Sequence, residues 1–589
     1  MSERGQALRL FPADDVAVFY ARGWWSRDTW DSLLRGHVAA RPDAEALCDA
    51  PNRPDFASGT PRRLSWREVD AAVDGLAAAL LAAGTRAGDV VGIQLPNVVE
   101  LAITYLACSR IGAIASPFPI QYREHELSAL GRLARLTAFV TMDHVRGRAN
   151  ARAIAALRDV IPSLRAVLAY GTDLPDGVLP LDDGEPAGRG GGPGAGRERP
   201  GELAAYLAGR SIDPADCVSL CWTSGTESVP KGVPRTHGDW IAVSMTTVQA
   251  PGLTAEDVLL NPFPMVAAGG FGGMFLPWLV TGARLVQHQP FDLEIFLAQV
   301  QAERVTYSVS PPAVLTRLLL EPDLMARFDL SSLRCVGSGS TPLTPFLIEG
   351  WEARGVSVIN FFGSNEGISL TGYPDNIPDP ADRGRYFPRP GAGLPSRIRT
   401  DQWTRARLVD AETGAEISST GQSGELRLKG PTVFAGYWDG AGTPFDDDGW
   451  YATGDIFQYA GDRGEYLLYI DRAKDLISRG GMKISAAEVE GLLQSCPGVA
   501  EVAAIGVPDP ILGERLCAVV VPQAAADVSL AALVAHLRAR QVASFKLPER
   551  LVIATELPRN PSGKVLKREL RKRFAVAAGA SSGASTPDR

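Results

Sequence analysis

Strand-like and helix-like segments alternate along most of this 589-residue chain, and this alternation constrains the fold more than any single motif. Residues 64–84 show the helical kind: Ser65 and Glu68 make a capping box, apolar residues recur at helical spacing, and Gly84 can end the helix. Residues 90–96, VVGIQLP, follow as a buried-strand candidate. The alternation favours an α/β architecture. The chain is too long for one hydrophobic core, so two or more domains are expected.

Composition and charge exclude several classes of protein. The formal net charge of −8 argues against a basic surface that would bind nucleic acid. No apolar run is long enough to span a bilayer. The first residues lack the apolar region of a secretory signal. Seven scattered cysteines without a CxxC pair argue against a disulfide framework and a structural zinc site. We therefore expect a cytoplasmic protein with no nucleic-acid partner and no membrane span.

Two stretches are too rich in small and polar residues to join a core. Residues 182–202 are dominated by glycine and proline, which predicts a mobile surface loop. Residues 575–589 predict a disordered tail. No internal repeat of roughly 20–50 residues is visible, so a solenoid is not expected.

The stretch TSGTESVPKG, residues 223–232, follows the strand candidate CVSLCW (217–222) at its carboxyl end, where α/β sheets usually bind ligands. Its hydroxyl groups and glycines can present donors to an anion, and Lys231 adds a mobile positive charge suited to a polyphosphate. The stretch is not a Walker A motif, because Pro230 precedes the lysine and Gly232 follows it. Taken alone, such a loop is equally compatible with a solvated surface turn.

Four further motifs follow in order: NFFGSNEG at 360–367, GWYATGD at 449–455, DRAKDLISRGGMKISAAEVE at 471–490 and NPSGKVLKREL at 560–570. Together with the loop at 223–232, they closely resemble the adenylate-forming superfamily. That superfamily comprises acyl- and aryl-CoA ligases, stand-alone aryl-acid adenylating enzymes, peptide-synthetase adenylation domains and firefly-type luciferases. The resemblance runs from Trp24 to Arg571. Five ordered motifs argue strongly against a chance match.

The resemblance implies an α/β protein of two domains. A large N-terminal domain, residues 1–471, would consist of stacked αβ layers with a small β subdomain, and would bind ATP and the acyl group. A small mobile α+β domain, residues 472–574, would act as a lid and carry the catalytic lysine. The implied substrates and cofactors are a small carboxylic acid, ATP, Mg²⁺ and either coenzyme A or a phosphopantetheinyl carrier protein.

The same resemblance assigns roles position by position. It assigns ATP binding to Thr223, Ser224, Gly225, Thr226, Lys231, Gly339, Ser340, Phe362, Gly363, Asp455 and Arg472. It assigns catalysis to Lys564, Glu366 and Asn365, and Mg²⁺ binding to Glu366 and Thr226. It assigns the acyl pocket to Val266, Ala267, Gly269 and Gly270, the hinge to Lys474, and the thiol tunnel to Gly480 and Gly481.

Two positions depart from the family pattern. Glu227 and Ser228 stand where the loop usually carries Thr-Gly, and a carboxylate near a triphosphate is repulsive unless it faces solvent or Mg²⁺. In the acyl segment, PFPMVAAGGFGG at 262–273, Ala267 replaces the histidine or aromatic residue that CoA ligases often have. No aspartate stands near Pro264 to hold an α-ammonium. The segment therefore suits an apolar aliphatic or aromatic body, without naming the acid.

The implied function is ATP-dependent activation of a carboxylic acid to an acyl-adenylate with release of pyrophosphate. Thioester formation with coenzyme A and release of AMP would follow. The nearest alternative is a stand-alone aryl-acid adenylating enzyme that loads a carrier protein. GWW at 23–25 and PRTHGDW at 234–240 are similar to its dihydroxybenzoate-activating branch, whereas GKVLKREL at 563–570 is closer to the CoA ligases. A luciferase-like oxygenase is less favoured, and intact Glu366 and Lys564 argue against a non-catalytic relative.

Overall fold

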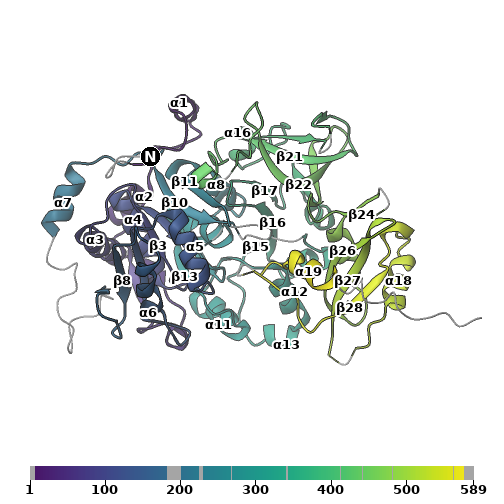
Figure 1. Cartoon of the computed structure of the whole chain (residues 1–589), viewed down its shortest axis with the longest axis horizontal. Helices are drawn as coiled ribbons and strands as arrows, with labels where there is room; N and C mark the ends of the chain where they lie inside the picture. Colours follow the sequence, from purple (N-terminus) through teal and green to yellow (C-terminus); the bar gives the residue numbers. More distant parts are fainter. Residues whose placement is uncertain are drawn as a thin grey trace, which may run out of the picture.

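The computed structural model describes residues 7–181, 200–223, 230–266, 268–339, 342–410, 413–440, 442–479, 482–524, 526–560 and 563–575. Figure 1 shows these residues as three parts in a row, purple and blue at one end, teal and green in the middle, and yellow at the other end. Most of the predicted loop at 182–202 and of the predicted tail at 575–589 lies outside the described residues. The end of the predicted loop differs from expectation, because helix α7 (Pro200–Ala208) already begins there, with a proline at its start.

The first sheet has seven strands in the order β11-β10-β4-β3-β5-β8-β9. They are β3 (Val90–Ile93), β4 (Ile114–Pro117), β5 (Ala138–Met142), β8 (Ala166–Tyr170), β9 (Leu179–Pro180), β10 (Cys217–Trp222) and β11 (Gly232–Thr236). Neighbouring strands are parallel except for the antiparallel pair β10 and β11. β3 and β10 confirm the strands predicted at 90–96 and 217–222. Helix α3 (Trp66–Ala82) confirms the predicted helix, with the Ser65–Glu68 capping box at its start.

The second sheet has eight strands in the order β17-β16-β15-β14-β12-β13-β1-β2. They are β1 (Glu45–Cys48), β2 (Arg63–Ser65), β12 (Val258–Asn261), β13 (Arg284–Gln287), β14 (Tyr307–Val309), β15 (Cys335–Gly339), β16 (Ser357–Gly363) and β17 (Ser369–Gly372). Its inner strands are parallel, and the pairs at the two edges are antiparallel. β1 lies beside β13, where Leu47 pairs with Leu285, so an early segment of the chain completes a late sheet.

Helix α4 (Val99–Ile111) connects the cores of the two sheets. All of its residues are buried, which is expected of a helix that is covered on every side. Val91 of the first sheet, Tyr105 of α4 and Leu285 of the second sheet belong to one hydrophobic cluster. Helices α8 (His237–Gln249) and α10 (Leu276–Thr281) contribute to the same cluster. The two sheets and these helices therefore form one layered body.

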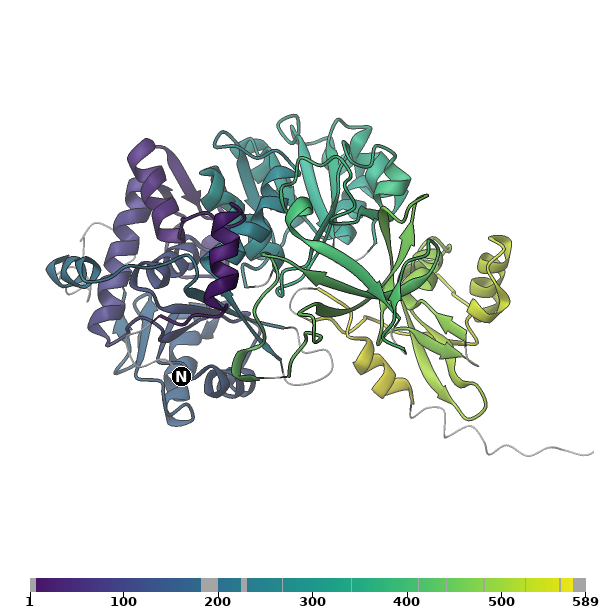
Figure 2. The same cartoon turned by 90° about the horizontal axis from the view of Figure 1, so that it is seen from above.

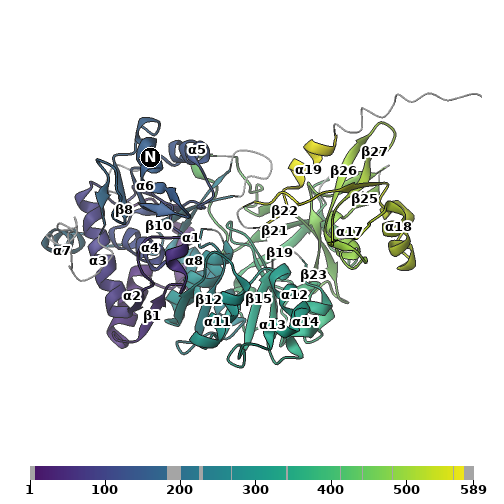
Figure 3. The same cartoon turned by 90° about the horizontal axis from the view of Figure 1, so that it is seen from below.

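Other helices surround the two sheets. They are α1 (Ala13–Ala21), α2 (Trp30–Ala40), α5 (Glu124–Ala134), α6 (Asn150–Ala155), α9 (Ala268–Gly270), α11 (Leu293–Glu303), α12 (Pro312–Leu320), α13 (Pro322–Met325), α14 (Pro345–Glu352), α15 (Pro380–Arg383) and α16 (Thr400–Trp403). Figure 3 shows α11, α13 and α14 below β12 and β15 in that view, with α12 beside β15. In the described part of the chain, no helix combines the length and apolar character needed to cross a bilayer.

A third sheet is antiparallel throughout, in the order β18-β23-β22-β21-β19-β20. Its strands are β18 (Tyr386–Pro388), β19 (Arg405–Val409), β20 (Glu416–Ile417), β21 (Ser423–Lys429), β22 (Tyr451–Ala460) and β23 (Tyr466–Arg472). Its core contains Leu408, Leu426 and Phe457, together with Val233 from β11. The shared cluster attaches this sheet to the first one.

The described chain ends in a fourth, smaller sheet with three helices packed around it. The strands are β24 (Ile477–Arg479), β25 (Met482–Ile484), β26 (Val499–Asp509), β27 (Gly513–Pro522) and β28 (Arg550–Ile553). The helices of this part are α17 (Ala486–Leu493), α18 (Leu530–Ala539) and α19 (Lys567–Ala575). Figures 1 and 2 show this yellow part beside the third sheet, with α19 turned towards the body of the molecule.

Candidate active site

One cavity of about 880 Å³ lies where the sheets and the C-terminal part meet. Described residues that were predicted for the site and line this cavity are Thr223, Val266, Gly269, Gly270, Phe362, Gly363, Asn365, Glu366, Arg472 and Lys564. Gly339 lines an adjoining pocket. Ser224, Gly225, Thr226, Ala267, Ser340, Gly480 and Gly481, and the departing residues Glu227 and Ser228, lie outside the described residues. Residues from four of the five motifs thus line a single space. Asp455 of the fifth motif lies against it through its ion pair with Arg472.

Thr223 and Lys231 close the base of the predicted phosphate loop. The backbone N–H of Lys231 donates to Thr223 Oγ1 at 2.9 Å, and the N–H of Thr223 donates to the Lys231 carbonyl at 3.0 Å. These bonds continue the β10–β11 ladder by one pair, so both ends of the loop are fixed by the sheet. The Lys231 ammonium lies 4.5 Å from the centre of the Tyr437 ring.

A turn after β16 carries Asn365 and Glu366. The backbone N–H of Ala268 donates to Asn365 Oδ1 at 2.8 Å, and Arg235 Nη1 donates to the Asn365 carbonyl at 2.6 Å. Gly367 ends the turn with φ +99°, and a Cβ there would lie 1.9 Å from the Thr432 carbonyl oxygen. Only glycine permits this approach. The Asn365 side chain therefore connects the turn to the acyl segment, and its expected role at the α-phosphate stays a prediction.

Arg235 is the buried connector behind this turn. It forms an ion pair with Asp239, Nε to Oδ2 at 3.0 Å, and both side chains are fully buried. Its Nη2 also donates to the Thr432 carbonyl at 3.0 Å. Burial raises the pKa of Asp239 to about 6, although the guanidinium opposes the shift. A buried charge held by this many partners fixes the position of the Asn365 turn.

Asp455 lies at the bottom of the nucleotide side of the site. Its carboxylate is fully buried, and Arg472 Nε is 2.7 Å from Oδ1. That approach lacks hydrogen-bond geometry, and among the described residues both carboxylate oxygens are left without a donor. Burial raises the pKa of Asp455 to about 6, against the charges of Arg472 and Lys564. Two orphaned buried acceptors are a strong indication of a ligand that supplies donors.

Lys564 reaches the same space from the C-terminal part. Burial lowers the pKa of its ammonium to about 8, and the positive charge of Arg472 adds to the shift, whereas Asp455 and Asp475 oppose it. The backbone N–H of Lys564 donates to Asn560 Oδ1 at 2.8 Å, which fixes the turn that carries it. Lys564 therefore lies beside a carboxylate and an arginine, and its pKa is close enough to neutral pH for its protonation state to change near physiological pH.

The predicted hinge at Lys474 precedes an ion pair. Arg571 Nη2 of α19 lies 2.9 Å from Asp475 Oδ1. Lys567 of the same helix lies 2.9 Å from Glu490 of α17. The first pair ties the last helix, which begins three residues after Lys564, to the segment that joins the third and fourth sheets, and the second pair ties it to α17. The hinge role of Lys474 itself stays a prediction.

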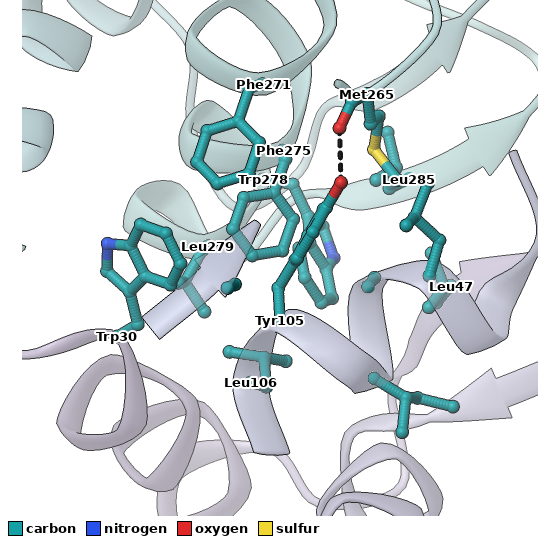
Figure 4. Packing of buried hydrophobic residues seen from close by; sticks show 14 of the residues in the cluster. Trp30, Leu47, Tyr105, Leu106, Met265, Phe271, Phe275, Trp278, Leu279 and Leu285 are labelled. Carbon is teal, nitrogen blue, oxygen red and sulfur yellow. Dashed lines mark hydrogen bonds between the residues drawn. The ribbon is translucent and has the colours of Figure 1, made fainter. Parts of the chain in front are cut away.

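The acyl segment is held from behind by α4 and the loop before it. Asn97 Nδ2 donates to the Phe263 carbonyl at 2.7 Å, and Asn97 Oδ1 accepts the Met265 N–H at 3.1 Å. Figure 4 shows the Tyr105 hydroxyl pointing to the Met265 carbonyl among packed aromatic rings. A Cβ on Gly270 would lie 2.4 Å from the Pro264 carbonyl oxygen, so this glycine lets the segment fold back on itself.

Beyond this segment, the cavity continues into a pocket of about 130 Å³. Its wall consists of Trp240, Val243, Thr247, Phe263, Ala268, Gly269, Gly272, Gly273, Val309, Ser338, Gly339, Phe361, Phe362, Gly363, Ser364, Ile368 and Ser369. Among these described residues no side chain is charged. Its buried polar groups already have protein partners: Thr247 Oγ1 donates within 2.9 Å to backbone carbonyls, and Ser338 Oγ donates to the Ser310 carbonyl at 2.8 Å.

Three contributors to the site were not predicted as site residues. Arg235 lies in the PRTHGDW motif, which was noticed only as a family resemblance. An arginine four residues before an aspartate, inside an apolar strand and helix start, is the signal that could have revealed a buried pair. Asn97 and Tyr437 gave no such signal, because their partners are distant in sequence.

The chain matches two family models. Residues 34–438 match the model described as AMP-binding enzyme, and residues 488–564 match the AMP-binding enzyme C-terminal domain. The chain is 33% identical to a 2-hydroxy-7-methoxy-5-methyl-1-naphthoate–CoA ligase of Streptomyces carzinostaticus, over 95% of both proteins. It is 30% identical to a salicyl-AMP ligase/salicyl-S-ArCP synthetase of Mycobacterium tuberculosis, over 97% of this chain and 95% of that protein.

A solved structure supports the same relationship. The crystal structure of ATP-bound MatB from Rhodopseudomonas palustris has a TM-score of 0.74 and 28% identity to this chain. The match covers 93% of this chain and 99% of that one. The large body and the small C-terminal part therefore have the arrangement of a known two-part enzyme fold.

Proposed function

The chain belongs to the AMP-binding enzyme family, the adenylate-forming superfamily, and from that premise we propose that it activates an uncharged aryl acid and transfers it to coenzyme A. Formation of an acyl-adenylate from a carboxylic acid is the activity of the family as a whole. The acid and the acceptor are the proposed parts. The observation that carries the choice of acid is the charge-free pocket behind the acyl segment.

On the nucleotide side, Asp455 receives the ribose hydroxyls. Its two buried oxygens without donors fit a ligand that offers two O–H groups, and Arg472 stands beside them as a second contact. Phe362 lies between the adenine side and the acyl pocket, with its ring held by Phe457 at a centroid distance of 5.2 Å. Lys231, whose backbone closes the base of the loop, would meet the β- and γ-phosphates with its ammonium.

In the first step, a carboxylate oxygen of the acid attacks the α-phosphorus of ATP. The bond from that phosphorus to the bridging oxygen breaks, and pyrophosphate leaves with the electron pair. Negative charge grows on the phosphate oxygens, so positioned cations supply most of the rate enhancement. Lys564 lies on the acid side of the α-phosphate and Lys231 on the leaving-group side. Lys564 must be protonated to act in this way.

Mg²⁺ would be held by the Glu366 carboxylate. That group is half-buried and accepts one neutral hydrogen bond, from the Tyr437 hydroxyl at 3.2 Å, so carboxylate oxygen capacity remains for a hard cation. When bound, the ion neutralises phosphate charge. Thr226, the second residue predicted for this ion, lies outside the described residues.

In the second step, the thiol sulfur of coenzyme A attacks the acyl carbon. The bond from that carbon to the phosphate oxygen breaks, AMP leaves with the electron pair, and the thiol proton passes to solvent. Lys564 has no part in this step. In the family mechanism, the C-terminal part turns about Lys474 between the steps and removes this lysine from the cavity.

The acid fits the pocket by size and by lack of charge. An engineered apolar cavity of about 150 Å³ binds benzene, and the pocket here measures about 130 Å³. An α-ammonium or a second carboxylate would be buried without a partner of opposite charge, which is costly. One aromatic ring with small neutral substituents is therefore the body that fits.

Pyrophosphate exchange tests the choice of acid. We expect exchange with benzoate-type acids to exceed exchange with any common amino acid and with dicarboxylic acids by at least about tenfold. A series of benzoate, phenylacetate, octanoate and phenylalanine shows separately how an aromatic ring, an aliphatic chain and an α-ammonium affect the exchange rate. Exchange that is fastest with an amino acid would contradict the proposal, and fastest exchange with octanoate would replace the aryl acid by an aliphatic one.

A carrier protein is the second candidate acceptor, and the similarity to the salicyl-AMP ligase/salicyl-S-ArCP synthetase favours it. Both acceptors present the same pantetheine arm, so the nucleotide end of coenzyme A is the discriminating feature. If this protein binds the nucleotide end of coenzyme A, kcat/KM should be about tenfold or more lower with dephospho-CoA or pantetheine than with coenzyme A. The coenzyme A assignment is wrong if CoA leaves the adenylate untouched while a holo-carrier protein is acylated.

A further inference from the structure

The segment between β21 and β22 crosses the outside of the phosphate-loop hairpin at one fixed point. Trp438 Nε1 donates to the Leu133 carbonyl at 3.2 Å, which ties this segment to the end of α5. A Cβ on Gly232, the first residue of β11, would lie 2.8 Å from the Trp438 Cβ. The glycine therefore allows the crossing segment to lie directly against the hairpin. Tyr437, next to this crossing point, is placed by the same contacts.

Neighbouring rings fix the Tyr437 side chain. Phe434 packs edge-on against Tyr437 with the ring centres 4.9 Å apart, and Tyr451 packs against Phe434 at 5.3 Å. The Tyr451 hydroxyl is hydrogen-bonded to that of Tyr437. The Phe434 N–H also donates to the Glu366 carbonyl at 2.9 Å, so the aromatic cluster and the Glu366 turn are held together.

Two charged groups of the site meet this one ring. The Tyr437 hydroxyl donates to Glu366 Oε1 at 3.2 Å, and the Lys231 ammonium lies 4.5 Å from the ring centre. Both contacts are with a neutral group: one is a hydrogen bond from a phenol, and the other is a cation–π contact. Burial raises the pKa of Tyr437, and the Glu366 carboxylate adds to the shift, so the hydroxyl stays a donor over the working pH range.

We propose that Tyr437 is a positioning residue that holds Glu366 and Lys231 in place, with both charges available, before Mg²⁺–ATP arrives. This inference rests on the proposed function, because it assigns Glu366 to the ion and Lys231 to the phosphates. An ammonium and a carboxylate this close to one ring would gain by pairing with each other. A ligand would then have to break that pair before it could bind. The ring gives each group a weaker neutral partner, which the ligand can displace.

Two substitutions separate the two contacts. Tyr437→Phe keeps the ring and removes the hydroxyl, so we expect the Mg²⁺ concentration at half-maximal pyrophosphate exchange to rise by about tenfold. ATP affinity measured by calorimetry without Mg²⁺ should change by less than about twofold. Tyr437→Leu also removes the ring face, so we expect metal-free ATP affinity to fall by about two- to fivefold in addition. Tyr466→Phe, in β23 of the same sheet, is the matched control and should change neither quantity.

The pattern across the variants decides the outcome. A purely structural role would lower the melting temperature and scale both affinities together in the two variants. A Mg²⁺ requirement of Tyr437→Phe equal to that of the wild type overturns the proposal, even if Tyr437→Leu fails to fold. Failure of the proposed function is distinguishable, since the wild-type protein would then bind no ATP or exchange no pyrophosphate with any acid.

Discussion

The nucleotide side of the cavity is lined by charged side chains, whereas the acyl side is lined by apolar and small ones. Around Asp455, the wall carries Arg472, Lys564 and Glu366, and the charges of all three act on the pKa of Asp455. Around Gly273, the pocket is walled by apolar and small residues, and the Thr247 and Ser338 hydroxyls donate to backbone carbonyls. Under the proposed function, the first side selects its ligand by charge, and the second selects by shape. Substitutions should therefore affect chemistry on one side and choice of acid on the other.

The largest effect is expected from Lys564→Ala. If Lys564 meets the α-phosphate as proposed, its loss should lower adenylation by about 10²- to 10³-fold. Thiolysis of pre-made acyl-AMP should be unchanged, because the proposed mechanism uses Lys564 in the first step only. Lys572→Ala, at an exposed lysine in the last turn of α19, the helix that follows Lys564, is the control. Equal losses in both half-reactions would show that the charged side is not specific to one step.

On the acyl side, Gly273→Leu tests selection by shape. A Cβ at Gly273 meets only Val309 Cγ2, at 3.8 Å, so the side chain enters the pocket without a clash at its root. We expect kcat/KM for ring-sized acids to fall by about 10- to 200-fold while KM for ATP stays the same. Gly36→Leu on the exposed face of α2 is the matched control. A parallel rise in KM for ATP would mean that the two sides are not independent.

The pH profile tests the charged side without a mutation. Below about pH 6 the Asp455 carboxyl is protonated, and above about pH 8 Lys564 loses its charge. The charges of Arg472 and Lys474 lower the pKa of both groups, whereas Glu366 raises the pKa of Asp455 and Asp475 raises that of Lys564. We expect kcat/KM for ATP to be bell-shaped, with a loss of about tenfold per pH unit outside that window.

Two variants identify the group that causes each limb of this bell-shaped pH profile. Lys564→Arg should move the alkaline limb upward, because a guanidinium keeps its charge, and Asp455→Asn should remove the acid limb. The ratio of kcat/KM for two neutral ring acids should stay constant across the range, since no charged group lines their pocket among the described residues. If the ratio of the two kcat/KM values changes with pH, an ionisable group must lie on the acyl side.

The smallest effect is expected at Phe362, which lines both the main cavity and the acyl pocket. Its ring packs on Phe457 and Tyr469, each with a centroid distance of 5.2 Å. Phe362→Leu keeps apolar volume but loses the aromatic face, worth about 0.5–1.5 kcal/mol. We expect KM for ATP to rise by about two- to twelvefold, with a change in acid KM of the same order. An effect on only one substrate would assign the ring to that side.

The charged side was the more predictable of the two. Asp455, Arg472 and Lys564 lie in short motifs whose residue types follow from the chemistry of phosphate and ribose. The strands at 90–96 and 217–222 and the capped helix at 64–84 were predictable because local patterns determine them. The acyl pocket was only partly predictable. Trp240, Thr247 and Val309 come from three separate elements, and only packing brings them together.

Arg235 and Tyr437 show why the remainder could not be predicted. Arg235 contacts Asn365 and Thr432, which are 130 and 197 residues away in sequence, and both contacts are with backbone oxygens that any residue type could supply. Tyr437 meets Glu366 and Lys231 only because Gly232 lets the crossing segment approach. Such contacts depend on tertiary arrangement and leave no residue-type signal along the chain.

The position of β1 has a consequence for the synthesis of this protein. Leu47 pairs with Leu285, so the strand made first must wait until β13 has left the ribosome. At a synthesis rate of about 5–20 residues per second, that wait is on the order of ten to fifty seconds. During this time β1 and β2 can form only a short hairpin with an open edge, which is prone to pair with another chain. The first sheet can assemble earlier, whereas completion of the second depends on how well a nascent strand is shielded.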